Sequence, residues 1–168
     1  MAQQMPMQTP QDLFVHELSE VLSAERLIAE MLGEASGMVQ DQKIRDGLEQ
    51  HRRETEQHAK NVEQAISQLG AQPHPVQCHA VEGLHQDLRE AAKSNPSPEV
   101  LQGLVVGGAC KTEHFEIAAY NGLVKKAQAM GQNEVGELLQ QNLQDEQKML
   151  KQVAGVADQL TQQMAQQQ

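Results

Sequence analysis

Four long segments of this chain carry apolar residues at the spacing of a helix, and each is bounded by residues that start or stop helices. Thr9 and Ser97 each precede a proline, a pair that is typical of a helix N-terminus. Glycines stand where the apolar pattern ends, as they do at helix C-termini. The predicted helices run from Thr9 to Gly33 or Gly37, from Asp41 to Gly70, from Ser97 to Gly131, and from Asn133 into a glutamine-rich tail.

The first and third links between these helices are short, and the second link is long. A few residues join the first helix to the second and the third to the fourth, and short links make antiparallel neighbours. Residues 71–97 form the long link, which contains Pro73, Pro75 and Pro96 and a predicted short helix over residues 78–93. Two antiparallel hairpins joined by one long crossover are the connectivity of a ferritin-like four-helix bundle. We therefore predict an all-α fold of that class, with a short fifth helix in the crossover.

The composition agrees with a helical domain. Aromatic residues make up 2% of the chain, with no Trp, whereas sheets draw on aromatic and β-branched residues. A length of 168 residues is enough for one domain with a real core. We expect a disordered N-terminus over residues 1–8, the bundle over residues 9–162, and the glutamine-rich tail over residues 163–168.

The charge of the chain excludes several kinds of partner. The formal net charge is −10, which argues against nucleic acid and against anionic membrane surfaces. No apolar run approaches the roughly 20 residues that a membrane span needs. The N-terminus has neither the basic nor the apolar region of a signal peptide, so we expect a cytoplasmic protein. Cys78 and Cys110 belong to no CxxC pair and are interpreted as free thiols in a reducing compartment.

Every predicted helix interrupts its apolar stripe with charged residues near its centre. Glu25 and Glu113 each lie 15 residues after the proline that opens their helix, while Glu54 and Glu146 each lie 13 residues after Asp41 and Asn133. Mid-helix positions in a bundle meet at the same height whichever way each helix points. Five glutamates and one histidine would then share one small volume: Glu25, His51, Glu54, Glu113, Glu116 and Glu146.

A group of buried carboxylates needs either cations or solvent. An unpaired buried carboxylate costs several kcal/mol, and clustered carboxylates repel one another. One interpretation is that some of these residues face water; the other, which their matched heights favour, is a metal site. Single glutamates from two helices and i, i+3 pairs from the other two are the known pattern for two bridged ions. Such oxygen-rich ligands suit iron, or alternatively manganese. The bridges could be Glu54 and Glu116, or Glu113 and Glu146.

Other polar residues near these positions have two interpretations each. His58 could be an alternative ligand, a residue that orients a ligand, or a partly exposed histidine. Tyr120 and Asn142 could orient a liganding carboxylate or simply belong to the core. We expect His114 at the surface or in a dimer interface. A zinc site from Cys78 and the crossover histidines is not favoured, because no second cysteine is near.

The chain also resembles a known family, the YciE/YciF ferritin-like stress proteins of bacteria. The resemblance rests on "DLFVHELSEVLSAE" (12–25), "EQHRRET" (49–55), "CHAVEGL" (78–84), "KTEHFEIAAYNGL" (111–123) and "LLQQNLQDEQK" (138–148). It implies a four-helix bundle with a fifth short helix, a rubrerythrin-like di-metal site and a homodimer. It also implies a link to stress responses. The six residues named above are the positions to which the resemblance assigns the metal.

Two functional hypotheses follow. The first is a di-iron or di-manganese bundle that reacts with oxygen or peroxide, by iron oxidation or peroxide removal. The second is a non-catalytic structural or interaction bundle that dimerises or docks a stress partner, with a structural or vestigial metal. Redox turnover of the metal separates them, since only the first requires it.

Overall fold

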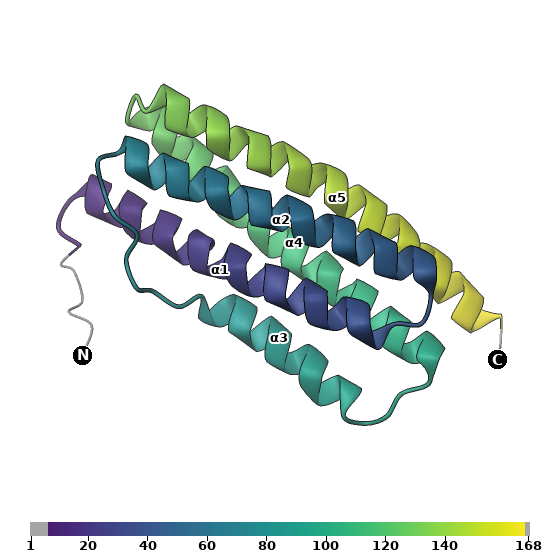
Figure 1. The fold of residues 1–168 in the computed structure, drawn as a ribbon. Helices are drawn as coiled ribbons and strands as arrows, with labels where there is room; N and C mark the ends of the chain where they lie inside the picture. Colours follow the sequence, from purple (N-terminus) through teal and green to yellow (C-terminus); the bar gives the residue numbers. More distant parts are fainter. Residues whose placement is uncertain (1–6, 167–168) are drawn as a thin grey trace.

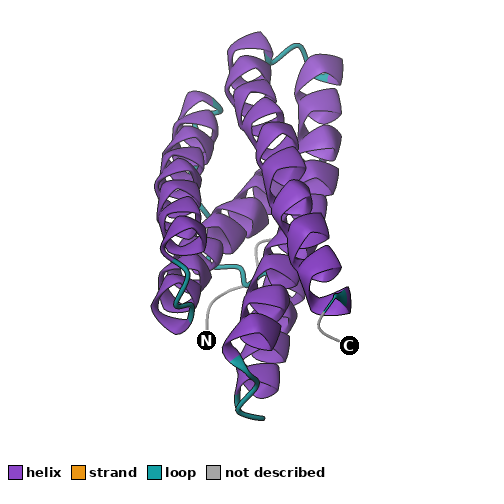
Figure 2. Ribbon diagram, turned by 90° about the vertical axis from the view of Figure 1, so that its right-hand side faces the viewer, coloured by secondary structure: helices purple, strands orange, loops and turns teal. Residues whose placement is uncertain are grey.

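The computed structural model of the chain describes residues 7–166, and every regular element in that range is a helix (Figure 1; Figure 2). The four long helices predicted from the sequence are present, and the short helix α3 lies in the crossover. The fold class is therefore confirmed as an all-α, ferritin-like four-helix bundle. The helices are α1 (Pro10–Met38), α2 (Gln42–Gln68), α3 (His79–Ala92), α4 (Pro98–Ala129) and α5 (Asn133–Ala165).

The bundle is built from two helical hairpins. Helix α1 packs along α2, and α4 packs along α5. The hairpins join through contacts of α2 with α5 and of α1 with α4. Helix α3 lies outside this four-helix core, beside α1 and against α4 (Figure 1). The long crossover is what lets α4 begin at the far end of the bundle from the end of α2 (Figure 1).

The four predicted helix starts are confirmed, and those at Thr9, Asp41 and Ser97 are capped by side-chain hydrogen bonds. The Thr9 hydroxyl accepts from the amide of Asp12 at 3.1 Å, and the Asp12 carboxylate accepts from the amide of Thr9 at 2.9 Å. This reciprocal pair satisfies two amides that the helix itself leaves unpaired. Asp41 caps α2 through a single bond, its Oδ1 accepting from the amide of Ile44 at 3.0 Å.

Two glycines end helices as predicted. Gly70 and Gly131 both have φ of 69°, a left-handed conformation that side chains disfavour. Gly131 lets the amide of Gln132 turn back to the carbonyl of Ala127 at 2.9 Å, which closes the end of α4. Helix α1 ends at Met38, one residue past the second of its two predicted ends.

The ends of the chain are only partly covered by the structure. Helix α5 continues to Ala165, so the first three residues of the glutamine-rich tail are helical. Residues 1–6 and 167–168 lie outside the described residues, and so does the disorder predicted for them. Within residues 7–166, every helix is too short or too polar to serve as a membrane span.

The interior has two apolar cores separated by a polar layer. One core joins the N-terminal half of α1 to α2, α4 and α5 and includes Phe14, Ile66 and Leu139. The other joins the C-terminal half of α1 to α3 and α4 and includes Ile28 and Val81. On α1, Glu25 lies between residues of the two cores and is 0% exposed. The polar layer therefore lies at mid-height of the bundle, as the sequence predicted.

Candidate metal centre

Five of the six predicted ligands come together in the polar layer. Helix α1 contributes one, α2 one, α4 two and α5 one. None is more than 2% exposed, so all five side chains are buried within the bundle. These residues are Glu25, His51, Glu113, Glu116 and Glu146.

The side chains form two groups that could each hold a metal ion. In the first group His51, Glu113, Glu116 and Glu146 each offer a ligand atom, and these atoms all lie within 4.8 Å of one another. In the second group, the same holds for Glu25, His58 and Glu146. Glu146 belongs to both groups. A carboxylate shared in this way can bridge two adjacent ions, as in two-metal sites whose ions lie about 4 Å apart.

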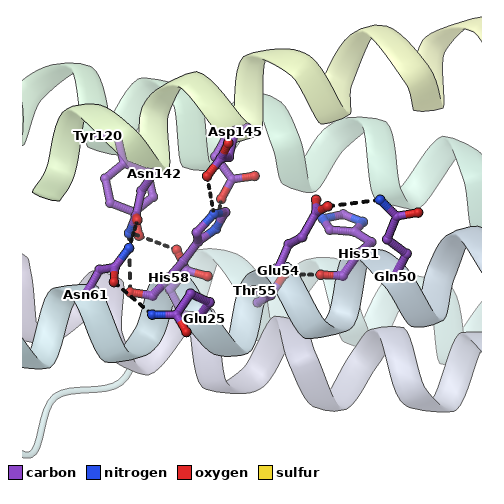
Figure 3. Close-up of polar contacts among 12 residues, drawn as sticks. Glu25, Gln50, His51, Glu54, Thr55, His58, Asn61, Tyr120, Asn142 and Asp145 are labelled. Atoms are coloured by element: carbon purple, nitrogen blue, oxygen red, sulfur yellow. Dashed lines mark hydrogen bonds and ion pairs between the residues drawn. The ribbon is translucent and has the colours of Figure 1, made fainter.

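Helix α2 contributes His58 where the sequence pattern had suggested Glu54. Seven residues make almost two helical turns, so His51 and His58 face the same way to within about 20°. Thr55 lies between them and donates to the carbonyl of His51 at 3.1 Å. Glu54 is half-buried and outside both groups, and its Oε1 accepts from Nε2 of Gln50 at 3.0 Å (Figure 3). Glu54 as a ligand stays a prediction.

The contacts between the histidines and the carboxylates are short but not aligned as hydrogen bonds. Nε2 of His51 lies 2.6 Å from Oε1 of Glu113, and Nδ1 of His58 lies 2.7 Å from Oε1 of Glu146. All four atoms nevertheless lack a hydrogen-bond partner. Atoms that approach closely without pointing at each other are arranged as ligands around a common ion would be.

Burial and mutual repulsion make the carboxyl groups hard to ionise without a cation. Burial, reinforced by the charge of Glu146, raises the pKa of Glu25 to about 8 and the pKa of Glu113 to about 10. The pKa of Glu116 also lies well above its ordinary value, because that side chain is fully buried beside Glu146 and Glu25. These groups need either protons or metal ions as counter-charges.

The two histidines differ in their electrostatic surroundings. Burial lowers the pKa of His51, so that its imidazole is neutral, the form that binds metal ions. Burial acts in the same direction on His58, but the carboxylates of Glu146, Glu25 and Asp145 outweigh it and raise the pKa of His58 to about 9. In the absence of a metal ion, a protonated His58 is one of the counter-charges of the cluster.

The donor set fits two divalent cations. Within residues 7–166, some buried side-chain polar atoms lack a hydrogen-bond partner. Most of them belong to this cluster, including both oxygens of Glu113 and of Glu116. Buried polar atoms normally find partners, so a group of unsatisfied ones requires an explanation. No Lys or Arg among the described residues forms an ion pair with these carboxylates. Four ionised carboxylates carry the charge that two divalent ions would neutralise.

A hydrogen-bond network holds one side of the cluster in place. The Tyr120 hydroxyl donates to Oε1 of Glu25 and accepts from Nδ2 of Asn142 at 2.9 Å. Oδ1 of Asn142 accepts from Nδ2 of Asn61 at 2.7 Å. Nδ2 of Asn142 also donates to the carbonyl of His58 at 3.2 Å. Figure 3 shows these side chains gathered at one end of the layer. Tyr120 thus orients a candidate ligand, one of the two interpretations that the sequence allowed.

Asp145 has a similar relation to His58. Its Oδ2 lies 3.5 Å from Nε2 of His58, while Nδ1 of the same ring faces Glu146 (Figure 3). A carboxylate behind a histidine is the usual arrangement for orienting a metal-bound imidazole. Sequence reasoning did not single out Asp145. The one feature of the sequence that could have indicated this role is that Asp145 directly precedes the candidate ligand Glu146.

The remaining histidines that the sequence singled out lie elsewhere. His114 is exposed on α4, in keeping with the surface interpretation. His85 on α3 is buried and faces Glu34 on α1, with 2.9 Å between Nε2 and Oε2. Cys78 is buried in the second apolar core. His85 therefore serves a contact between α3 and α1, away from the polar layer.

A four-helix bundle with a carboxylate and histidine cluster at its centre defines the class of this protein. Comparison with known proteins gives the family: residues 9–166 match the model of a domain of unknown function, DUF892, and the chain belongs to that family. Among curated proteins, Protein YciF of Escherichia coli (strain K12) is 29% identical over 143 residues, which cover 84% of this chain and 86% of that protein. The resemblance seen in the sequence is confirmed.

Solved structures give the same result. The E. coli stress protein YciF superposes with a TM-score of 0.88 at 26% identity, over 93% of this chain and 99% of that one. YcfI of Rhodopseudomonas palustris, described as a candidate structural protein, has a TM-score of 0.85 at 28% identity, over 90% and 96%. A protein of Xanthomonas campestris pv. campestris shares the fold, with a TM-score of 0.75 at 19% identity over 95% and 98%.

Proposed function

We propose that this protein is a di-metal carboxylate protein that binds two iron ions, or alternatively two manganese ions, and reacts with oxygen or peroxide. The observation that carries the proposal is the position of Glu146, which belongs to two ligand groups whose buried atoms lack other partners. His51, Glu113 and Glu116 would complete one ion's ligands, and Glu25 and His58 the other's. Glu54, at the edge of the layer, is retained as a further candidate ligand.

Residues around the candidate metal centre are arranged to support the reduction of a peroxide there. Two ferrous ions held there would supply the two electrons that, with two protons, convert a peroxide ROOH to ROH and water. Tyr120 orients Glu25, and Asp145 lies behind His58. The two apolar cores lie on either side of the polar layer and limit its contact with water.

The first experiment is the metal content of the untagged protein, measured by mass spectrometry. We expect about two iron or manganese ions per chain, and fewer than one in Glu146→Ala, because the shared ligand is lost. Glu137→Ala is the matched control, since Glu137 lies on the same helix but is exposed. A wild-type protein that stays metal-free after incubation with Fe(II) or Mn(II), while circular dichroism shows it folded, would sink the proposal.

One observation favours the alternative of a structural or interaction bundle. The relative from Rhodopseudomonas palustris is described as a candidate structural protein. In that case the metal would be structural or vestigial, and the bundle would dimerise or dock a partner. The two functions separate in an assay of metal oxidation by oxygen or hydrogen peroxide. Oxidation of the bound metal that is repeated each time fresh Fe(II) or a chemical reductant is added supports the enzyme, whereas bound metal that does not change oxidation state supports the structural role.

The setting of the protein is part of the same proposal. The E. coli relative is called a stress protein, and we assign this chain to the bacterial stress response on that similarity. We further propose a cytoplasmic homodimer. Analytical ultracentrifugation of the metal-loaded protein tests the dimer, and a single species of monomer mass at micromolar concentration would exclude it.

A further inference from the structure

A cavity of about 370 Å³ opens between the first half of α2, helix α4 and the second half of α5. The lining residues that are buried are apolar apart from one histidine: Leu48, His51, Val106, Ala109 and Met149. The exposed lining residues are mostly polar, among them Gln50, Gln152 and Gln159. The cavity thus has a polar mouth and an apolar inner end.

The inner end of the cavity reaches the candidate metal centre. His51 lines the cavity and is 2% exposed, and its Nε2 lies 2.6 Å from Oε1 of Glu113 without a hydrogen-bond partner. Met149, also in the wall, lies one helical turn beyond Glu146. A molecule in the cavity would therefore be separated from the carboxylate cluster by a single imidazole ring.

The charges around the cavity select an uncharged molecule. Apart from His51, the only ionisable lining residues are Asp41 and Lys43, which are of opposite sign and both exposed at the start of α2. Neither an anion nor a cation would find a counter-charge at the apolar inner end. The volume is in the range of sites for small organic molecules and exceeds what hydrogen peroxide needs. An apolar wall favours a hydrocarbon, which gains by leaving water.

We infer that this cavity binds the hydrocarbon part of an organic hydroperoxide, with the peroxide group toward His51. The inference rests on the proposed function and names the substrate class of that site. A hydroperoxide fits because it joins an apolar body to a small uncharged polar group. The body matches Leu48, Val106 and Met149, and the polar group matches the one polar side chain at the inner end.

Gly47 offers a variant that fills the cavity. It lines the cavity from α2, and a Cβ added there meets no atom within 4 Å. Gly47→Phe therefore adds a large side chain at the cavity wall without a clash at its Cβ, and a helical glycine is replaced by a better helix former. Gly83→Phe is the matched control, because Gly83 is also helical, exposed and without neighbours within 4 Å of an added Cβ, but lies on α3.

The binding test uses the full-length protein and 2-phenyl-2-propanol, the unreactive alcohol that corresponds to cumene hydroperoxide. We expect the methionine methyl signal of Met149, assigned with Met149→Leu, to shift on titration of the metal-free wild type. Affinity should fall about tenfold or more in Gly47→Phe and stay unchanged in Gly83→Phe. An unmoved Met149 signal, or equal affinity in both variants, overturns the inference whatever the metal does.

The reaction test separates this inference from the proposed function. Protein loaded with Fe(II) is given cumene hydroperoxide or hydrogen peroxide, and each peroxide is followed. Wild type should consume both, and Gly47→Phe should lose only the reaction with cumene hydroperoxide. If wild type consumes hydrogen peroxide alone, or Gly47→Phe consumes both as fast as wild type, the cavity assignment falls and the proposed function stands. If neither peroxide is consumed, the proposed function falls and takes the hydroperoxide assignment with it.

Discussion

The Tyr120 hydroxyl donates a hydrogen bond to the Glu25 carboxylate, 95 residues earlier in the chain, and both side chains are 0% exposed. The contact ties α4 to α1 at the level of the cluster. It also fixes which oxygen of Glu25 remains free, since Oε2 has no partner. Tyr120 is the only tyrosine in the chain, so its removal can be followed without interference from another.

Tyr120→Phe tests whether this contact positions a ligand. The loss of a partner that orients a ligand typically weakens metal binding by about 10–100-fold. The variant should also lower the free energy of unfolding by about 1–3 kcal/mol, because Asn142 loses an acceptor inside the protein. Chelator competition measures the first effect and urea denaturation the second.

Ile66→Val provides the comparison for Tyr120→Phe. Ile66 lies in the apolar core away from the ligands, and the truncation costs about 1 kcal/mol. This variant should lose stability and keep its metal affinity. If Tyr120→Phe behaves in the same way, the tyrosine is a core residue and does not position Glu25.

The metal-free protein should become less stable as pH rises. The pKa of Glu25 is raised to about 8 and that of Glu113 to about 10, above the ordinary value of 4.5, and the pKa of His58 is raised from 6.5 to about 9. A folded state that holds these protons more tightly than the unfolded state is favoured at low pH. The two glutamates contribute fully to the free energy of unfolding below pH 4.5. That contribution is lost as pH rises through 8 for Glu25 and through 10 for Glu113. The contribution of His58 is complete below pH 6.5 and is lost through 9.

Urea midpoints in the presence of EDTA, measured at several pH values between about 6 and 10, check this dependence. With Fe(II) or Mn(II) excluded, the midpoint should fall across the range. Metal-loaded protein should not show the fall, because metal ions replace the protons. A midpoint of metal-free protein that rises with pH would mean that the carboxylates are ionised and satisfied in some other way.

Glu116→Gln should stabilise the metal-free protein while it weakens metal binding. Both oxygens of Glu116 lack a partner, and burial next to Glu146 and Glu25 raises its pKa. The amide has nearly the same shape and no charge, so the free energy of unfolding of the metal-free protein should rise at neutral and alkaline pH. Thermal unfolding with and without metal measures both effects. Exposed Glu137→Gln should change neither, and a destabilised metal-free Glu116→Gln would contradict the prediction.

Helix α3 should loosen when its contact with α1 is removed. Oε2 of Glu34 accepts from Nε of Arg89 at 3.1 Å and lies 2.9 Å from Nε2 of His85. Arg89 and His85 together lower the pKa of Glu34 to about 2, so the contact persists down to acidic pH and is lost as pH falls from 4.5 through 2. In Glu34→Gln we expect faster hydrogen exchange of the α3 amides at neutral pH.

Glu82→Gln is the control for this exchange experiment. Glu82 pairs with His79 within α3, with 2.7 Å between the two side chains, and does not reach α1. Its loss should leave exchange in the middle of α3 unchanged. Equal exchange in both variants would show that apolar packing alone, through residues such as Val81, holds α3 in place.

The fold could be predicted because its signals are local. Thr9, Asp41 and Ser97 cap helices with their own side chains, and Gly70 and Gly131 adopt the left-handed backbone that ends a helix. Link lengths then decide which helices are neighbours. The height of the polar layer was equally accessible, since it needs only the distance of each charged residue from its helix start.

The exact members of the cluster were not accessible in the same way. The template of single glutamates and i, i+3 pairs favoured His51 with Glu54, whereas the groups assembled in the bundle use His51 with His58. A few tens of degrees of helix rotation decide between them, and packing against three other helices sets that rotation. Tyr120 and Asn142 could be named from the sequence as residues that orient a ligand, but Asn61 and the hydrogen bonds that join the three could not, because these bonds link residues far apart in the sequence.

Glu54→Gln and His58→Gln together decide which residue of α2 serves the second ion. His58 lies in a ligand group with Glu25 and Glu146, while Glu54 accepts from Gln50 at the edge of the layer. We expect His58→Gln to bind about one ion fewer per chain and Glu54→Gln to keep full occupancy with a smaller loss of affinity. Metal content and chelator competition measure the two quantities. The reverse result would mean that Glu54 swings inward when metal binds, exchanging its bond to Gln50 for an ion. His58, with Asp145 behind it, would then act on the cluster only through Glu146.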